Sequence, residues 1–255
     1  MGANDSNPKA ATRSAPAAAT KNEQKNMDMS IPEGMNLIDQ RYEEKMAAFE
    51  LDCNDGQGVG KACHQVGEYY SVVKEEYARS KVIYETNCFR EKDPYFPSCF
   101  NLARLYLGGR GGVEQSDKKA AELFEKACDC GHLQGCYHQG VLQFLLNEGN
   151  QRKQLRAIDV MARSCSEGEA DSCYFAGSHY LDTKVASSIR NPEKAVDLLQ
   201  MGCDRNHAPS CYNLAILFKN GDEGVLADKQ RYEEFKVKTE TLVGGGSSIN
   251  GTKIG

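Results

Sequence analysis

The sequence lacks several features that would indicate common classes of protein. Of its 255 residues, 31 are basic and 36 acidic, which gives a formal net charge of −5, and no segment concentrates lysine and arginine. Binding to a nucleic-acid backbone requires many such cations, so we expect no nucleic-acid partner. No apolar run approaches the length that crosses a bilayer, so we expect no integral membrane segment. Sustained alternation of apolar and polar residues is also missing, and we therefore expect no sheet.

Motifs for several kinds of site are missing as well. There is no Cys-x-x-Cys pair of the kind that structural zinc favours, and no Cys-x-x-Cys-His for covalent attachment of haem. Ser-x-x-Lys occurs three times, without either companion motif of the β-lactamases and penicillin-binding proteins. The three matches are scattered along the chain, at Ser6/Lys9, Ser71/Lys74 and Ser116/Lys119. We expect no serine hydrolase and name no catalytic residue.

Cysteine, by contrast, is abundant and regularly spaced. Ten of the eleven cysteines form five neighbouring pairs, and the second members of the pairs recur at steps of 36, 37, 37 and 38 residues. The pairs are Cys53/Cys63, Cys88/Cys99, Cys128/Cys136, Cys165/Cys173 and Cys203/Cys211. The eleventh cysteine, Cys130, is left over.

A helical motif repeats in step with these pairs. A small residue follows each second cysteine by four positions, and in four of the five copies an aromatic residue follows it by seven. Residues at these spacings share one face of a helix, which predicts a buried stripe. The small residues are Gly67, Ala103, Gly140, Gly177 and Ala215, and the aromatic ones are Tyr70, Tyr106, Tyr180 and Phe218. In the third copy, Gln143 and Phe144 blur the pattern.

A second helical pattern precedes the first cysteine of each later pair, with a small residue eight positions before it: Ser80, Ala120, Ala157 and Ala195. Two amphipathic helices in each period of about 37 residues are typical of stacked helical hairpins. The sequence therefore predicts an all-α fold, an α-solenoid of about five antiparallel helix pairs over residues 35–242. The polar segments 1–34 and 243–255 are predicted to be disordered.

The position of the cysteines favours disulfides over the other uses of cysteine. Each pair places one cysteine at the end of a helix and the other at the start of the next, where a bridge would contribute about 2.5 kcal/mol by loop closure. We predict five disulfides between neighbours, with Cys130 as a free thiol. Two alternatives stay open: eleven reduced, buried thiols in a cytosolic solenoid, and a soft-metal site formed by Cys128, Cys130 and His132.

Two stretches carry a resemblance to a known family. Ser98-Cys-Phe-Asn-Leu-Ala-Arg-Leu-Tyr-Leu-Gly-Gly-Arg-Gly-Gly-Val113 and Asp117-Lys-Lys-Ala-Ala-Glu-Leu-Phe-Glu-Lys-Ala-Cys128 resemble the Sel-1-like repeat. The added cysteine pairs resemble the disulfide-rich, Hcp β-lactamase-like subtype of secreted bacterial proteins. With five cysteine-bearing units and no signal peptide, residues 36–241 are similar to the mitochondrial cytochrome c oxidase assembly factor seven family.

This resemblance implies a location and a function. Residues 1–30 contain neither the apolar core of a secretory signal nor an arginine-rich amphipathic face, while disulfides require an oxidising compartment. Members of the family are imported into the mitochondrial intermembrane space and oxidised there by the disulfide relay. The resemblance thus implies a monomeric, non-catalytic scaffold that binds respiratory-chain assembly components on its concave surface.

A redox or haem-handling factor on the same scaffold is the alternative that the resemblance leaves open. Cys130 would be the exchanging thiol, although its place after a helix C-terminus and beside Asp129 is expected to raise its pKa. Axial ligands for haem would come from histidine and methionine. The candidates are His64, His132, His138, His179, His207, Met161 and Met201.

Overall fold

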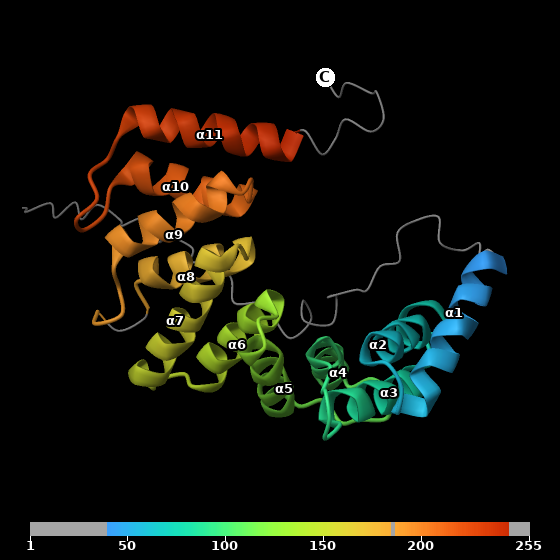
Figure 1. The fold of residues 1–255 in the computed structure, drawn as a ribbon. Coiled ribbons are helices and arrows are strands. Elements are labelled where there is room, and N and C mark those ends of the chain that lie inside the picture. Colours follow the sequence, from blue (N-terminus) through green and yellow to red (C-terminus); the bar gives the residue numbers. More distant parts are fainter. Residues whose placement is uncertain (1–39, 185–186, 245–255) are drawn as a thin grey trace, which may run out of the picture. The chain divides into compact units, whose positions relative to one another are not determined.

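A computed structural model describes residues 40–184 and 187–244 (Figure 1). Helices follow one another along this part of the chain, joined by short connections. The α-helices are α1 (Gln40–Cys53), α2 (Gly60–Glu68), α3 (Tyr77–Phe89), α4 (Phe96–Gly108), α5 (Asp117–Asp129), α6 (Leu133–Leu146), α7 (Gln151–Glu167), α8 (Ala170–Leu181), α9 (Pro192–Asp204), α10 (Ala208–Asn220) and α11 (Lys229–Gly244). A 3₁₀ turn, η2 (Asn54–Gly56), follows α1, and a π-helical turn, η3 (Tyr69–Val73), extends α2.

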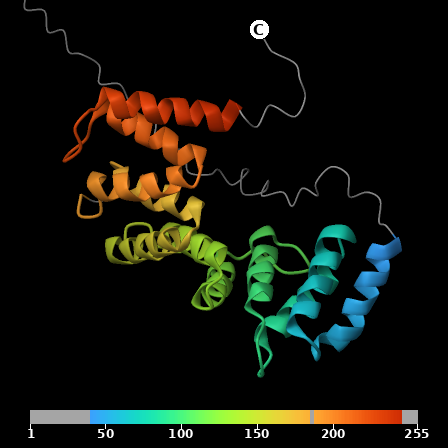
Figure 2. The same ribbon diagram turned by 45° about the horizontal axis from the view of Figure 1, so that its top comes forward.

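The helices form the predicted α-solenoid. Each helix packs against the next one in the chain, as Figure 2 also shows, and α2, α6, α7 and α8 additionally contact the helix two places further on. Within the described residues, the extended pairing is limited to one isolated bridge between Asp222 and Val225. The predicted N-terminal tail, residues 35–39 of the predicted array, and the predicted C-terminal tail from residue 245 onward lie outside the described residues. The last helix ends at Gly244, two residues beyond the predicted end of the array.

The small residues after the cysteines set the distance between neighbouring helices. Gly140 of α6 faces Met161 of α7, and Gly177 of α8 faces Leu199 of α9. A methyl group on either glycine would overlap the facing side chain. Met161 and Leu199 each lie four positions before the first cysteine of a pair and are fully buried. The repeat therefore matches a small residue on one helix with a large one on the next.

The blurred third copy also has a structural explanation. The buried aromatic in α6 is Phe144, whereas Gln143, which occupies the expected position, is only partly buried. Leu142 belongs to a core cluster with residues of α3–α5, and Phe144 belongs to the cluster that continues through α7–α11. The aromatic residue has moved by one position because α6 contributes to two separate parts of the core.

Candidate functional site

The five neighbouring cysteine pairs are joined as disulfides in the structure. The bridges are Cys53–Cys63, Cys88–Cys99, Cys128–Cys136, Cys165–Cys173 and Cys203–Cys211. Each links the end of an odd-numbered helix to the start of the next, from α1–α2 through α9–α10. Their Cα–Cα separations run from 4.5 to 4.9 Å, within the range that disulfides adopt. We refer to α2, α4, α6, α8 and α10, which carry the second cysteines, as the cysteine-led helices.

The bridged cysteines are part of the hydrophobic core and form no reactive site. Nine of the ten are buried, and Cys128 is partly exposed. Cys99 is fully buried in the core cluster that α3, α4 and α5 share, and Cys211 is fully buried in the cluster of α7–α11. Cys99 Sγ lies 3.7 Å from the carbonyl oxygen of Cys88, and Cys211 Sγ lies 3.6 Å from that of Cys203. A bridged sulfur has no hydrogen to donate, so these are packing contacts, and both cysteines are structural residues with no role as ligands or nucleophiles.

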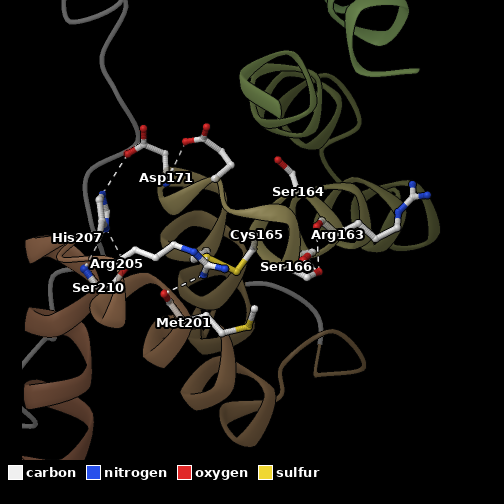
Figure 3. Close-up of a disulfide and its surroundings, with 12 residues drawn as sticks. Arg163, Ser164, Cys165, Ser166, Asp171, Met201, Arg205, His207 and Ser210 are labelled. Atoms are coloured by element: carbon white, nitrogen blue, oxygen red, sulfur yellow. Dashed lines mark hydrogen bonds and ion pairs between the residues drawn. A yellow bond between two sulfur atoms is a disulfide. The ribbon is translucent and has the colours of Figure 1, made fainter. Parts of the chain in front are cut away.

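Arginine side chains lie against two of the bridges. Arg205 donates from Nη1 to the Met201 carbonyl oxygen at 2.9 Å and approaches Cys173 Sγ at 3.7 Å (Figure 3). Arg90 approaches Cys63 Sγ at 3.9 Å and donates to the carbonyl of Gly58. Both arginines stand two positions after the first cysteine of the following pair. The guanidinium of one unit thus covers the bridge of the unit before it.

Aromatic side chains gather on the cysteine-led helices at the position directly after the cysteine. They are Phe100 on α4, Tyr137 on α6, Tyr174 on α8 and Tyr212 on α10. The exposure of these side chains increases toward the C-terminal end of the chain. Phe100 is buried, Tyr137 and Tyr174 are half-buried, and Tyr212 is 55% exposed. Phe175 joins the row, with its ring centroid 5.3 Å from those of both Tyr137 and Tyr174.

Two histidines cap the cysteine-led helices. Nδ1 of His132 accepts the backbone N–H of Gly135 at the start of α6, and Nδ1 of His207 accepts that of Ser210 at the start of α10. A side chain that accepts these free amides stabilises the start of a helix. Both histidines stand four positions before the second cysteine of a pair. This spacing is visible in the sequence, but we did not predict from it that the two histidines cap helices.

Two other histidines are packed against phenylalanine rings. His138 stacks on Phe124 with centroids 4.9 Å apart, and His179 stacks on Phe144 at 3.8 Å. Burial lowers the pKa of His138 to about 4, aided by the positive charge of Arg104, and burial alone lowers that of His179 to about 4. Both imidazoles are therefore neutral at neutral pH.

The remaining candidate haem ligands make other contacts in the fold. His64 bonds to Ser98 Oγ through Nδ1 at 3.1 Å, and its Nε2 lies 3.5 Å from Glu68. Met161 is fully buried against Gly140, and Met201 supplies its carbonyl oxygen to Arg205. Capping, hydrogen bonding and stacking are the contacts that the structure shows for the five histidines. We assign no haem to these residues.

Cys130 is exposed and ends α5 as its C-cap residue. Partial burial raises the pKa of its thiol, and the charge of Asp129 raises it further. An elevated pKa reduces the thiolate fraction and with it the capacity for exchange. The considered metal site is also unsuited to an ion, because Cys128 is bridged and Nδ1 of His132 accepts an amide hydrogen. No group of three histidine, cysteine or acidic side chains suited to a metal occurs in residues 40–184 and 187–244.

The two serine–lysine motifs that the structure describes do not assemble a nucleophile. Ser71 is buried in η3, and its hydroxyl lies 3.1 Å from that of Tyr84. Lys74 projects instead to Glu43, with a distance of 3.0 Å between Nζ and the carboxylate. Ser116 is the N-cap of α5 and accepts the amide of Lys119. The Ser6/Lys9 match lies outside the described residues.

The Sel1 repeat family matches this chain at residues 97–132, 170–207 and 208–231. The first of these matches covers α4 and α5, so the repeat begins with a cysteine-led helix, and each bridge joins one repeat to the next. The chain is therefore an all-α, disulfide-linked helical array that contains Sel1 repeats at these three stretches. Two solved structures share the fold: a protective antigen of uropathogenic Escherichia coli with an SLR fold (TM-score 0.64, 20% identity, 77% of this chain and 41% of that one), and a Sel1 repeat protein from Oxalobacter formigenes (TM-score 0.62, 18% identity, 82% and 60%).

The chain is also similar to the cytochrome c oxidase assembly factor 7 proteins. It is 26% identical to the Homo sapiens protein over 161 residues, which covers 57% of this chain and 67% of the human one. It is 27% identical to the Mus musculus protein over 161 residues, which again covers 57% of this chain and 67% of that protein. Identity to the Drosophila melanogaster homolog is 27% over 104 residues, covering 40% of this chain and 38% of that protein. The resemblance predicted from the cysteine-bearing repeats is thereby confirmed.

Sequence reasoning did not find the row of aromatic side chains as a surface, although each of its members was visible beside a cysteine. The signal was the recurrence of tyrosine directly after the second cysteine in three consecutive units. It also missed the two arginines, since their contact with a bridge joins residues of different units. None of the described helices is both long and apolar enough to span a bilayer.

Proposed function

We propose that this chain is an assembly factor of the mitochondrial intermembrane space that promotes the assembly of respiratory-chain complexes, chiefly cytochrome c oxidase. The observation that carries the proposal is its similarity to the assembly factor 7 proteins over 161 residues. The array supplies an extended surface of stacked helices, which suits the binding of other proteins. No described group is activated for catalysis, so the proposed action is binding, with the protein as a monomer.

The disulfides support the proposed compartment. Five bridges persist only where thiols are not kept reduced, as in the secretory pathway or the intermembrane space. The similarity to mitochondrial assembly factors favours the second, with the disulfide relay as an additional partner. Alkylation of free thiols in protein taken directly from cells, followed by peptide mapping, should find ten oxidised cysteines and a single labelled one, Cys130. Labelling of the neighbour pairs would overturn the proposed compartment.

The function is tested by removing the protein from cells. Native gels and oxygen consumption should show less assembled cytochrome c oxidase, and the wild-type chain should restore it. Normal oxidase in the absence of the protein would overturn the assembly function while leaving the fold untouched.

Variants separate binding from thiol chemistry. Cys130→Ser should restore oxidase fully, because its thiol is unactivated and its side chain is exposed. The double variant Cys165→Ser, Cys173→Ser should fail to restore it, because the array between α7 and α8 loses its covalent link. Failure of Cys130→Ser with a normal protein level would favour the thiol–disulfide reductase instead.

A further inference from the structure

Two of the five bridges have a guanidinium against one of their sulfurs. Nη1 of Arg205 lies 3.7 Å from Cys173 Sγ, and Nη2 of Arg90 lies 3.9 Å from Cys63 Sγ. Both cysteines are fully buried, and each arginine also donates to a backbone carbonyl oxygen, which holds its guanidinium in place. A positive charge is therefore fixed beside one particular sulfur of each bridge. We call these two bridges, Cys53–Cys63 and Cys165–Cys173, the arginine-covered bridges.

The other three bridges differ from the arginine-covered bridges in this contact. Within residues 40–184 and 187–244, no arginine or lysine nitrogen lies within hydrogen-bond distance of their sulfurs. The corresponding position, two residues after the first cysteine of the following pair, is occupied by Cys130 in one unit and by Glu167 in another. The repeat thus places a cation beside some bridges and a neutral or acidic residue at the same position elsewhere.

A guanidinium beside a sulfur favours the reduced form of a bridge. Reduction requires one of the two sulfurs to leave as a thiolate, and a neighbouring positive charge lowers the pKa of that thiol. A stabilised thiolate raises the reduction potential of the bridge, and a thiol of lower pKa is also the better leaving group. The oxidised bridge gains no comparable stabilisation, because a disulfide carries no charge.

We propose that Arg90 and Arg205 make the arginine-covered bridges the two that a thiol reductant opens most readily. In the second of them, a thiolate of the reductant attacks Cys165 Sγ, the S–S bond breaks, and Cys173 Sγ leaves with the electron pair as a thiolate beside Arg205. A second thiolate of the reductant attacks the mixed disulfide, and Cys165 leaves and takes up a proton. Two reductant thiols are thereby oxidised to a disulfide, the bridge gains two electrons, and one proton is released to solution.

The structural consequence is an array with two redox-sensitive joints. The arginine-covered bridges link α1 to α2 and α7 to α8, so mild reduction removes the covalent link at these two places and leaves the other three. All four of their cysteines are buried, so the bridges keep their structural role until the reductant concentration rises. This property goes beyond the proposed assembly function and does not depend on it.

The test measures the reduction of each bridge at equilibrium in the intact protein. The protein is equilibrated at pH 9 with mixtures of reduced and oxidised dithiothreitol and quenched with acid, and differential alkylation with peptide mapping quantifies each cysteine. Mixtures that reduce only a small fraction of any bridge keep the array folded. The arginine-covered bridges should reach the same reduced fraction at a ratio of reduced to oxidised reagent about tenfold lower than the other three, which corresponds to about 30 mV. Equal reduction of all five bridges would overturn the proposal.

Substitutions at Arg205 separate its charge from its packing. Arg205→Gln should lower the equilibrium constant for reduction of its bridge about tenfold at pH 9, and Arg205→Lys, which keeps the positive charge, should lose less. Arg163→Gln is the matched control, because it removes the same charge two residues before Cys165 from a side chain that points away from the bridge (Figure 3). If Arg163→Gln has as large an effect as Arg205→Gln, the contact with the sulfur is not the cause and the proposal is wrong.

The pH dependence distinguishes stabilisation of a thiolate from a merely structural effect. At pH 6 the cysteines of a reduced bridge are mostly protonated with or without the guanidinium, since the ordinary pKa of a cysteine thiol is about 8.5. The effect of Arg205→Gln should therefore be much smaller at pH 6 than at pH 9. An effect of the same size at both pH values would mean that the arginine only packs against the bridge, and would overturn the proposal. These measurements use purified protein, so their failure would leave the assembly function untouched.

Discussion

Two half-buried histidines, His138 and His179, are expected to make the stability of the array depend on pH. His179 is packed on Phe144 and has a pKa of about 4 in the folded protein, against an ordinary value of 6.5. Between these values the unfolded chain binds a proton that the folded chain does not. Stability therefore falls as the pH drops from 6.5 toward 4, and the loss levels off below 4.

The depression of about 2.5 pH units corresponds to about 3 kcal/mol for each such histidine, at 1.36 kcal/mol per unit. His138 should lose a similar amount over the same window, because its pKa is also lowered to about 4. Together they could remove much of the net stability of an ordinary domain, about 5–15 kcal/mol. Urea unfolding followed by circular dichroism at pH 7, 5.5 and 4 measures the free energy of unfolding directly.

A substitution separates the contribution of one histidine to the pH dependence from that of the carboxylates that titrate in the same pH range. His179→Phe keeps an aromatic ring on Phe144 but cannot bind a proton. The difference in unfolding free energy between pH 7 and pH 4 should shrink by about 3 kcal/mol relative to wild type. Tyr180→Phe is the control, because it changes the next residue without altering titration in this window. An unchanged pH dependence in His179→Phe would refute the assignment of a neutral imidazole packed on Phe144.

Three further predictions concern the array itself. Replacing Cys165 and Cys173 with serine should lower the free energy of unfolding by about 2–4 kcal/mol and increase hydrogen exchange mainly in α7, α8 and their neighbours. A uniform increase in exchange from α1 to α11 would contradict coupling between nearest neighbours. Gly177→Val should lower the free energy of unfolding, measured by chemical denaturation, by about 1–3 kcal/mol, because the valine side chain would overlap Leu199. A second substitution, Leu199→Ala, should reduce the effect of Gly177→Val. Additive effects of the two substitutions would exclude the overlap. His207→Ala should lower the free energy of unfolding by about 1 kcal/mol because α10 loses its N-cap. His207→Asn should retain most of that stability, since asparagine can also cap a helix. Equal losses for the two variants in thermal unfolding would count against capping.

The fold could be predicted from the sequence because its determinants are local. A bridge between Cys128 and Cys136 closes one helix–helix connection, and Gly140 follows one helical turn later, so their meaning depends on only a few neighbouring residues. Repetition then strengthened each weak local signal. Where the pattern shifted, at Phe144, the sequence predicted the helix but not which part of the core its aromatic residue would enter.

The candidate site could be predicted only in part, since its groups come from different repeats. The sequence by itself determined that the chain is a disulfide-paired helical array and that Cys130 has no neighbouring partner. The tertiary structure decided that His207 pairs with Asp171 of α8, that Arg205 covers the bridge of another unit, and that Tyr137 packs against Phe175. These contacts join residues about one repeat apart in the chain, and the distance between them is set by how the helices pack rather than by helical spacing within either unit.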